Sequence, residues 1–460
     1  MTSVTTHIKD RLVEKTTLAI LTCCTGIGLI LSLADYIAVG VAIFALPAVL
    51  LLVSSVRLSA WLFIFSIFIL KLLSHSPPLL IPDVMALILL GAFVVDFLLN
   101  GQTEIKVPSI GKYFLALFIT IIVLSIFSYN YTYAVTSLLR IAVQFVIIII
   151  LYNAFNTREA ERLIKIFFWV AVVFSVHNLF YFFAEGGRDR IFGYAGAYFD
   201  DLSMLAWPVG LAYFLWLKSR RSSFIYGLGM VLVLLGLLAT QSRAALLTVI
   251  WVTPLILFYS WYKARKTSQK FVTTRLTFSL ITAIVFGVGF TMMDFLGGTI
   301  ARFQELPEIS SGTVWLRMSL WKTSLHAFLE NPITGVGPGT FRFVETIFPI
   351  LRFDAARLYL DQPSAHNLLL HYLAETGLTG TVVLLTLFFK NMKTSLKLAR
   401  FSIEGKHAAI SVGLLGAGLT IFGSIFYMDG WMWGQNAHAA PLFIAVTARL
   451  FYDKYQQSRN

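Results

Sequence analysis

The chain has 460 residues, of which 58% are hydrophobic and only 13% are charged, and its mean hydropathy is +0.79. Soluble domains use about 25% charged residues, so this composition excludes an ordinary soluble protein and indicates a polytopic membrane protein. The formal net charge is +13, which we attribute to loop charge that fixes orientation in the membrane rather than to nucleic-acid binding.

Apolar runs of about 20 residues recur along the chain, and a run of this length spans the hydrocarbon core as a helix. We predict an all-α polytopic integral membrane protein with fourteen candidate spans, at 17–33, 36–54, 58–73, 82–99, 112–128, 133–153, 162–184, 200–217, 224–239, 243–262, 274–295, 366–389, 408–427 and 437–452. The shorter runs can be half-spanning, so twelve transmembrane helices also fit the pattern. The two cysteines, Cys23 and Cys24, are adjacent in the first span, which predicts neither a disulfide framework nor a metal-binding cysteine cluster.

Most of the 36 Lys and Arg residues fall in alternate loops, and cytoplasmic loops carry the excess of positive charge. Both termini are therefore predicted to be cytoplasmic. We expect three regions: an N-terminal transmembrane bundle at 1–295, a large extracytoplasmic loop at 296–365, and C-terminal transmembrane helices at 366–460. Loops beyond about 12 to 15 residues are usually functional or disordered, so the loop at 296–365 is the first place to look for a site.

This long loop contains a helical pattern between Thr313 and Leu329, with apolar residues that include Leu320 and Leu325, and Asn331-Pro332 ends it. We expect an amphipathic helix on the membrane face. The segment Gly335-Val-Gly337-Pro-Gly339 resembles a phosphate-binding glycine loop in its letters alone, because no strand precedes it, and we predict a turn that shapes the loop.

Three residues on the predicted outer side are candidates for chemistry: Arg243 in the tight turn between two spans, Arg317 on the loop helix, and His366 where the loop returns to the membrane. Each has a structural alternative: Arg243 as a snorkelling arginine, Arg317 facing solvent or headgroups, and His366 capping a helix. Arginine pairs bidentately with phosphate oxygens, and histidine transfers protons near neutral pH. Together they fit an isoprenoid-diphosphate sugar donor, with the arginines neutralising the departing diphosphate and His366 deprotonating an attacking hydroxyl.

Three further arginines are weaker candidates for substrate binding. Arg188 and Arg190 open another outer segment and could contact phosphate or sugar, or form an interfacial charge cluster. Arg140 lies inside a predicted span, where a charge is costly, so we expect it to face a cavity, a polar partner or the interface. The loop has no metal-ligand cluster of carboxylates, so we predict metal-independent chemistry without a cofactor.

The order of several motifs resembles the bacterial O-antigen ligases and related O-oligosaccharyltransferases. His366-Asn367, nine residues and Gly377-Leu-Thr-Gly380 match the His-[Asn/Ser/Gln]-x9-Gly-x-x-Gly signature of that family. The preceding motifs agree and occur in family order: Gln241-Ser242-Arg243, Leu316-Arg317-x3-Trp321, and Asn331-Pro332-x2-Gly335-Val-Gly337-Pro-Gly339. The resemblance covers about residues 186–390. The segment Tyr198-Phe-Asp200-Asp201 departs from the Asn-containing version expected there.

The resemblance implies a GT-C-like glycosyltransferase of the bacterial inner membrane, with its site facing the periplasm. It implies that His366, Arg243 and Arg317 are functional, and we add Asn367 and Trp321 as substrate-binding candidates from the same motifs. The implied donor is an undecaprenyl-diphosphate-linked glycan and the implied acceptor is lipid A-core, joined with inversion. A second lipid-linked glycan (polymerase) and a protein hydroxyl (O-oligosaccharyltransferase) remain alternative acceptors. A glycan transporter fits less well, because the ionisable residues gather in one outer loop rather than along a midplane pathway.

Overall fold

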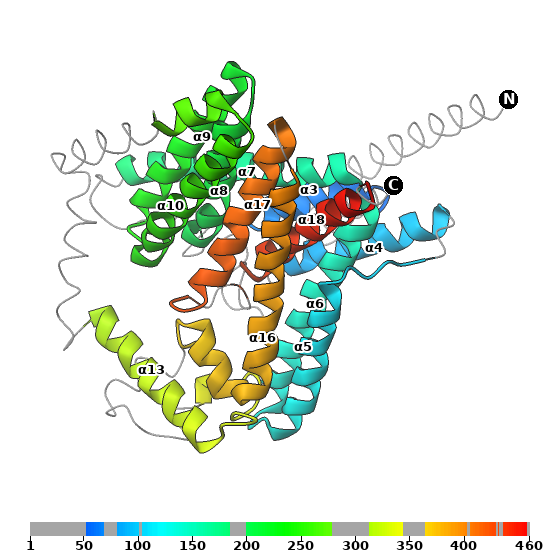
Figure 1. The fold of residues 1–460 in the computed structure, drawn as a ribbon. Helices are drawn as coiled ribbons and strands as arrows, with labels where there is room; N and C mark the ends of the chain where they lie inside the picture. The colour runs from blue at the N-terminus through cyan, green and yellow to red at the C-terminus, as the bar shows by residue number, and fades with distance from the viewer. Residues whose placement is uncertain are drawn as a thin grey trace, which may run out of the picture. The chain divides into compact units, whose positions relative to one another are not determined.

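The computed structural model describes residues 52–68, 81–100, 104–184, 199–277, 312–343, 364–402, 405–428, 431 and 436–457, and within these ranges every regular element is a helix. The first half contains α3 (Val56–Ser66), α4 (Ile81–Leu99), α5 (Gly111–Leu124), η1 (Ser125–Phe127), α6 (Tyr131–Ala154) and α7 (Thr157–Ala184). The second half contains α8 (Phe199–Trp216), α9 (Arg220–Ala239), α10 (Arg243–Lys266), α13 (Gly312–Glu330), η4 (Phe341–Phe343), α16 (Leu368–Phe401), α17 (Gly405–Ser424) and α18 (Asn436–Gln457) (Figure 1).

The helices confirm the predicted class of fold. Seven helices within the described ranges are long and apolar enough to cross a membrane, so the protein is a multi-pass membrane protein. Most of the described predicted spans coincide with a helix to within a few residues, for example 82–99 with α4, 133–153 with α6 and 200–217 with α8. The predicted span at 17–33 lies outside the described residues, as do most of the spans at 36–54 and 274–295, so the total of twelve or fourteen stays a prediction.

The chain forms two compact units, one of residues 1–63 and 83–105 and a larger one of residues 64–82 and 106–460. In the larger unit α8 is the central helix, since every one of its residues except Phe214 is buried. It packs against α7, α9, α10 and α17. Glycines permit the close approach: a Cβ on Gly416 of α17 would lie 2.4 Å from the Pro208 side chain of α8.

Helix α16 is broken at Gly377, whose φ of 58° and ψ of −158° are not helical. The predicted span at 366–389 falls almost entirely within α16, one of the seven long apolar helices, but it is interrupted by this break rather than continuous. A short helix at 368–376 precedes the break, and a longer helix from 378 to Phe401 follows it (Figure 1). His366 therefore lies one short helix before the break.

The predicted loop helix is confirmed as α13, which ends at Glu330, directly before Asn331-Pro332. Its buried side is formed by Ser319, Leu320, Thr323, Ser324 and Ala327. Leu325 and Leu329 lie on the other side and are exposed, Leu325 by 47%, and the predicted position of this helix on the membrane face stays a prediction. The buried side is made of small and hydroxylated residues, a pattern that an apolar periodicity does not capture.

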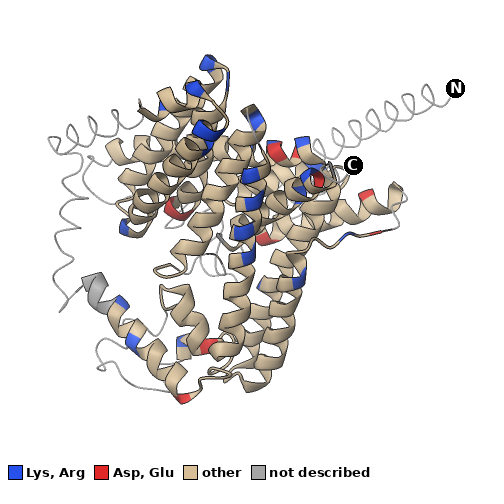
Figure 2. Ribbon diagram, in the orientation of Figure 1, with Lys and Arg blue, Asp and Glu red and all other residues tan. Residues whose placement is uncertain are grey.

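Basic residues gather along the C-terminal half of α16 and at the ends of several other helices (Figure 2). Two of them bind the last carbonyls of neighbouring helices. Lys263 Nζ donates to the carbonyls of Ala399 and Ser402 at the end of α16, and Arg275 Nη1 donates to that of Phe214 at 3.1 Å at the end of α8. Cations at helix C-termini satisfy carbonyls that lack intrahelical partners. These residues therefore have a structural role in addition to any role in topology, and the predicted orientation stays a prediction.

Candidate active site

His366 lies in a tight turn directly before helix α16. Its φ is 51°, in the left-handed region, and its backbone N–H donates to Ser364 Oγ at 3.0 Å. Asn367 is the N-cap of α16, with Oδ1 accepting from the Leu370 N–H at 3.0 Å. Non-glycine residues seldom adopt positive φ, although histidine and asparagine do so more often than most. The His366 backbone is thus held in an uncommon conformation by its neighbours.

The residues that follow α17 hold this turn through hydrogen bonds. Asn367 Nδ2 donates to the Phe426 carbonyl at 2.7 Å, and the Leu368 N–H donates to the Met428 carbonyl at 2.9 Å. The first N–H groups of a helix have no partner within the helix, so the bond from Leu368 satisfies a backbone donor that would otherwise be unpaired. Asn367, which we predicted to bind substrate, therefore uses both ends of its amide within the protein. Its substrate-binding role stays a prediction.

Trp321 joins the loop helix to the His366 turn. Its Nε1 donates to the Ala365 carbonyl at 3.1 Å, directly before His366. Arg317 precedes Trp321 by one helical turn, and residues four apart in a helix share a face. Both side chains are half-buried. A small apolar cluster of buried residues reinforces this contact and is formed by Leu320, Ala327, Val336, Phe341, Ala365 and Ala374.

Arg243 is the first residue of α10 and is half-buried. The turn before it is tight, because Gln241 has a φ of 51° and donates its N–H to the Leu238 carbonyl at 2.9 Å. Ser242 is the N-cap residue and is buried with Gln241. The arginine therefore lies at a helix N-terminus, where backbone N–H groups and the helix dipole already favour an anion.

Tyr427 connects α10 to the His366 turn. Its hydroxyl is 2.6 Å from Thr248 Oγ1 and accepts from Trp251 Nε1 at 2.9 Å. Burial raises the pKa of the Tyr427 phenol above its ordinary value; the hydrogen bonds with Thr248 and Trp251 act in the opposite direction, and the Asp201 carboxylate raises the pKa further. Tyr427 is flanked by Phe426 and Met428, the residues that hold the turn at Asn367 and Leu368. Tyr427 and its two neighbours thus link the helix that carries Arg243 to the turn that carries His366.

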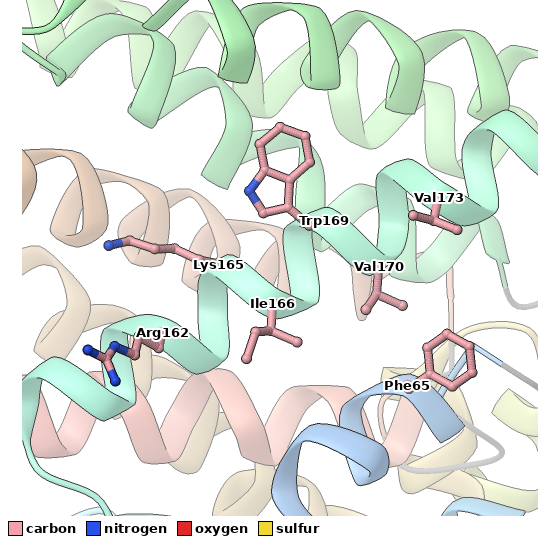
Figure 3. A pocket seen from close by; sticks show the side chains of 7 residues that line it. All are labelled: Phe65, Arg162, Lys165, Ile166, Trp169, Val170 and Val173. Carbon is pink, nitrogen blue, oxygen red and sulfur yellow. The ribbon is translucent and has the colours of Figure 1, made fainter. Parts of the chain in front are cut away.

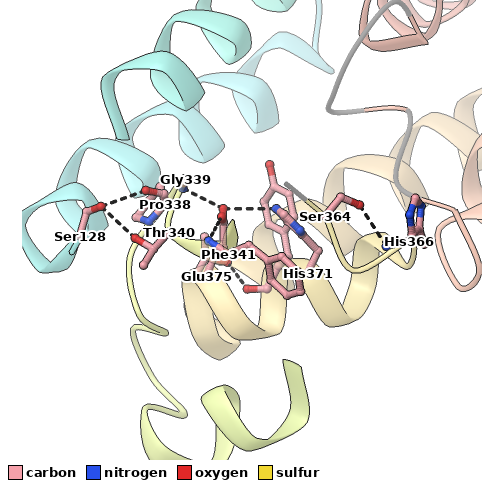
Figure 4. Close-up of polar contacts among 11 residues, drawn as sticks. Ser128, Pro338, Gly339, Thr340, Phe341, Ser364, His366, His371 and Glu375 are labelled. Atoms are coloured by element: carbon pink, nitrogen blue, oxygen red, sulfur yellow. Dashed lines mark hydrogen bonds and ion pairs between the residues drawn. The ribbon is translucent and has the colours of Figure 1, made fainter. Parts of the chain in front are cut away.

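The glycine loop, residues 332–340, makes backbone hydrogen bonds to both sides of the break in α16, and Figure 4 shows its contacts with Glu375 and Ser128. The Glu375 carboxylate accepts hydrogen bonds from two backbone N–H groups, that of Gly339 at 2.9 Å and that of Phe341 at 2.8 Å. Its Oε2 lies 3.4 Å from His371 Nε2. On the other side of the loop, Ser128 Oγ donates to the Pro338 carbonyl at 3.0 Å. The predicted turn is confirmed, since residues 332–336 form turns. The N–H groups of Gly339 and Phe341 bind a protein carboxylate.

Glycine is required in this loop by both conformation and space. Gly335, Gly337 and Gly339 have φ values of 64°, 98° and 73°. A Cβ on Gly337 would lie 2.2 Å from Ser128 Cα, and one on Gly377 would lie 2.4 Å from the Ile333 carbonyl carbon. Figure 4 shows His366 apart from the His371–Glu375 pair, which therefore belongs to the loop's support.

Of the three remaining predicted arginines, one lies in the part of the chain that the structure describes. Arg140 lies within α6 and is half-buried, whereas Arg188 and Arg190 lie outside the described residues. No site role was predicted for Asp200 and Asp201, which are buried in the first turn of α8, and Asp201 acts electrostatically on Tyr427; their adjacent position at the start of an apolar run was the signal. Among the described residues no three His, Cys, Asp or Glu side chains form a group that could hold a metal ion, and metal-independent chemistry stays a prediction.

These observations define a multi-pass helical membrane protein whose loop helix and span ends bring arginine- and histidine-bearing segments together. Residues 228–385 match the family model described as O-Antigen ligase, so the chain carries that family's domain over this segment. The match runs from α9 to the second half of α16, and it confirms the resemblance. The family implies a ligase- or polymerase-type membrane glycosyltransferase that uses lipid-linked glycans. No curated protein matches the sequence.

Proposed function

We propose that this protein transfers a glycan from undecaprenyl diphosphate to the lipid A-core oligosaccharide at the periplasmic face of the bacterial inner membrane. The observation that carries this proposal is the hydrogen bond from Trp321 to the Ala365 carbonyl. This bond joins the helix that carries Arg317 to the turn that carries His366. The reaction needs such a pair, a cation that binds phosphate and a base that accepts a proton.

In the proposed reaction His366 accepts the proton of an acceptor hydroxyl, and the oxygen attacks the anomeric carbon of the donor. The bond between that carbon and the diphosphate oxygen breaks, and undecaprenyl diphosphate leaves with the electron pair. Attack from the face opposite the leaving group inverts the anomeric configuration. Arg243 and Arg317 stabilise the negative charge that develops on the diphosphate, because a guanidinium offers two parallel N–H donors to phosphate oxygens.

The left-handed backbone at His366 supports this role for the imidazole. A strained residue persists only where its surroundings determine it, and such residues gather at functional sites. The bonds to Ser364, Phe426 and Met428 fix the backbone around His366. A fixed base can be oriented toward a bound hydroxyl with little further loss of entropy.

The base is tested with the variant His366→Ala and the matched control His407→Ala, an exposed histidine at the start of α17. We expect the first variant to lose transfer of purified lipid-diphosphate glycan and the second to retain it, while both keep the elution volume of the wild-type protein. Near-normal transfer by folded His366→Ala would contradict the proposal.

The acceptor is tested by incubating purified protein with one lipid-linked glycan, with and without lipid A-core. A ligase gives a single transferred species only when lipid A-core is present. A ladder of longer lipid-linked glycans without lipid A-core would identify a polymerase instead, and labelled protein as the product would identify a protein O-oligosaccharyltransferase.

A further inference from the structure

The loop helix α13 carries large aliphatic side chains on the side that faces away from the protein. Met318, Leu325 and Leu329 lie at helical spacing on one face and are between 36% and 66% exposed. The side buried against the protein consists mainly of small and hydroxylated residues. A helix in water buries its large aliphatic side chains and exposes polar ones. The arrangement in α13 is the reverse, and it is typical of helices that pack through small residues inside a bilayer.

The exposed apolar face of α13 continues onto the second half of α16. Ile333, shortly after the end of α13, is also exposed, and we call Met318, Leu325, Leu329 and Ile333 the outer row. The Ile333 carbonyl accepts from the Thr379 N–H at 3.3 Å and from Thr379 Oγ1 at 2.8 Å. These bonds fix the outer row against the start of the helix that follows the break in α16.

The apolar segment after the break is too short to cross the hydrocarbon core by itself. It covers residues 378–389, which make ~18 Å of helix at ~1.5 Å per residue, whereas the core is ~30 Å thick. Lys390 and Lys393 follow it, and α16 is one of the seven helices long and apolar enough to cross a membrane. A spanning helix of this composition needs the whole apolar segment inside the core. The exposed side chains of Leu378 and Val382 therefore contact acyl chains.

The helix α7 has the same order of residues along its length (Figure 3). Two basic side chains precede apolar ones along a cleft on this helix, formed by Arg162, Lys165, Ile166, Val170 and Val173. The basic ends of α7 and α16 lie on the same side, since Glu161 of α7 is 3.2 Å from Nδ1 of His407 in α17, which begins shortly after α16 ends. Basic residues at helix ends mark one boundary of the membrane. The break at Gly377 therefore lies toward the opposite boundary.

We propose that α13 is embedded in the lipid bilayer by the outer row, at the boundary between acyl chains and headgroups. Interfacial helices bury an apolar face ~5–10 Å into this boundary. Lys322 is exposed beside the outer row, so its ammonium group can reach headgroup phosphates. On its other side α13 is held by the bond from Trp321 to the Ala365 carbonyl.

Lipid fits this face better than a second protein does, because the outer row joins directly the side chains of α16 that contact acyl chains. A protein partner would have to displace lipid from both helices. Binding of the outer row to lipid does not depend on the proposed glycan transfer.

The test places a nitrobenzoxadiazole fluorophore on single cysteines of the full-length protein, with Cys23 and Cys24 replaced by Ala, in phosphatidylcholine nanodiscs that are open to water on both faces. Leu325→Cys and Leu329→Cys probe the outer row. Glu330→Cys is the matched control at an exposed position off the outer row, and Val382→Cys reports the hydrocarbon core. The quenchers are phosphatidylcholine with a nitroxide near the headgroup end of an acyl chain, the same lipid with the nitroxide near the terminal methyl, and iodide in the water. Every labelled variant must keep the elution volume of the wild-type protein.

We expect the nitroxide near the headgroups to quench the fluorophores at 325 and 329 about threefold more than the one at 330, because an interfacial face lies only ~5–10 Å deep. Iodide should show the opposite order, and the deep nitroxide should act most strongly at 382. Equal quenching by iodide at 325, 329 and 330 would overturn the proposal in favour of a helix in water. Protection of 325 and 329 from both iodide and the nitroxides would also overturn it, and would show that protein covers the outer row.

Discussion

Replacing Glu375 by Ala should loosen the glycine loop selectively. The carboxylate receives the N–H groups of Gly339 and Phe341 at 2.9 and 2.8 Å, and Glu375 is 4% exposed, so water cannot readily replace it. A buried donor without an acceptor costs ~1–3 kcal/mol, and two such donors cost ~2–6 kcal/mol together. The local opening free energy of the loop should fall by this amount, because the lost bonds hold the loop to α16.

Hydrogen–deuterium exchange of peptides covering residues 332–341 measures this opening free energy directly. Glu330→Ala is the matched control, since it removes a carboxylate from the exposed end of α13 and should change protection by less than ~0.5 kcal/mol. Glu375→Gln should fall between the two, because its amide keeps one acceptor oxygen and presents an N–H₂ group to the other donor. Protection of the loop in Glu375→Ala equal to that in Glu330→Ala would refute the reasoning.

Three further predictions concern the diphosphate, the glycine loop and the orientation. Arg243→Lys and Arg317→Lys should each lower glycan transfer at least tenfold in an assay with purified donor, because a point charge does not reproduce the guanidinium fork; full activity in both would exclude this role. Gly337→Ala should lower the yield of folded protein in size-exclusion chromatography, since its Cβ would meet backbone at 2.2 Å; wild-type yield would contradict the close approach. With Cys23 and Cys24 replaced by Ala, a cysteine at 330 should react with an impermeant thiol reagent in cells with a permeabilised outer membrane, and one at 397 should not; the reverse labelling would invert the predicted topology.

The sequence predicted the helices well where a run of apolar residues ends at a local signal. Asn130 is one example: its side chain accepts from the N–H groups of Thr132 and Tyr133, and α6 begins within two residues of the predicted span. Asn331-Pro332 is another, because it ends α13 as predicted. These signals act between neighbours in the chain, so a single sequence contains them.

The break at Gly377 was not predicted, because its cause is distant in sequence. The Leu378 N–H donates to the Pro332 carbonyl and the Gly337 N–H to the Glu375 carbonyl, so the loop replaces bonds that a continuous helix would make within itself. Hydropathy continues through residues 366–389 without a change that would reveal this exchange. The hydrogen bonds of Tyr427 were not predicted for the same reason, since its partner Thr248 is about 180 residues away in the chain.

The candidate site was predicted in part. The motifs indicated which segments belong together, and the bond from Trp321 to Ala365 joins two of them. Their letters did not reveal that Asn367 caps a helix with one end of its amide and binds Phe426 with the other, because side-chain partners depend on packing that a motif does not encode. The buried acidic pair Asp200-Asp201 was noted only as a departure from the family pattern.

The contact between Ser128 and the glycine loop has a consequence for building hybrid proteins. Ser128 lies in the short turn between η1 and α6, about 100 residues before the segment that matches the family model, yet it binds Pro338 and Thr340 inside that segment. A hybrid that joins residues 228–385 to membrane helices from another protein must therefore bring a turn that fits against Gly337 without a clash. Exchange at the family boundary alone would separate the two halves of this contact, whereas a hybrid that retains residues 125–133 keeps them together.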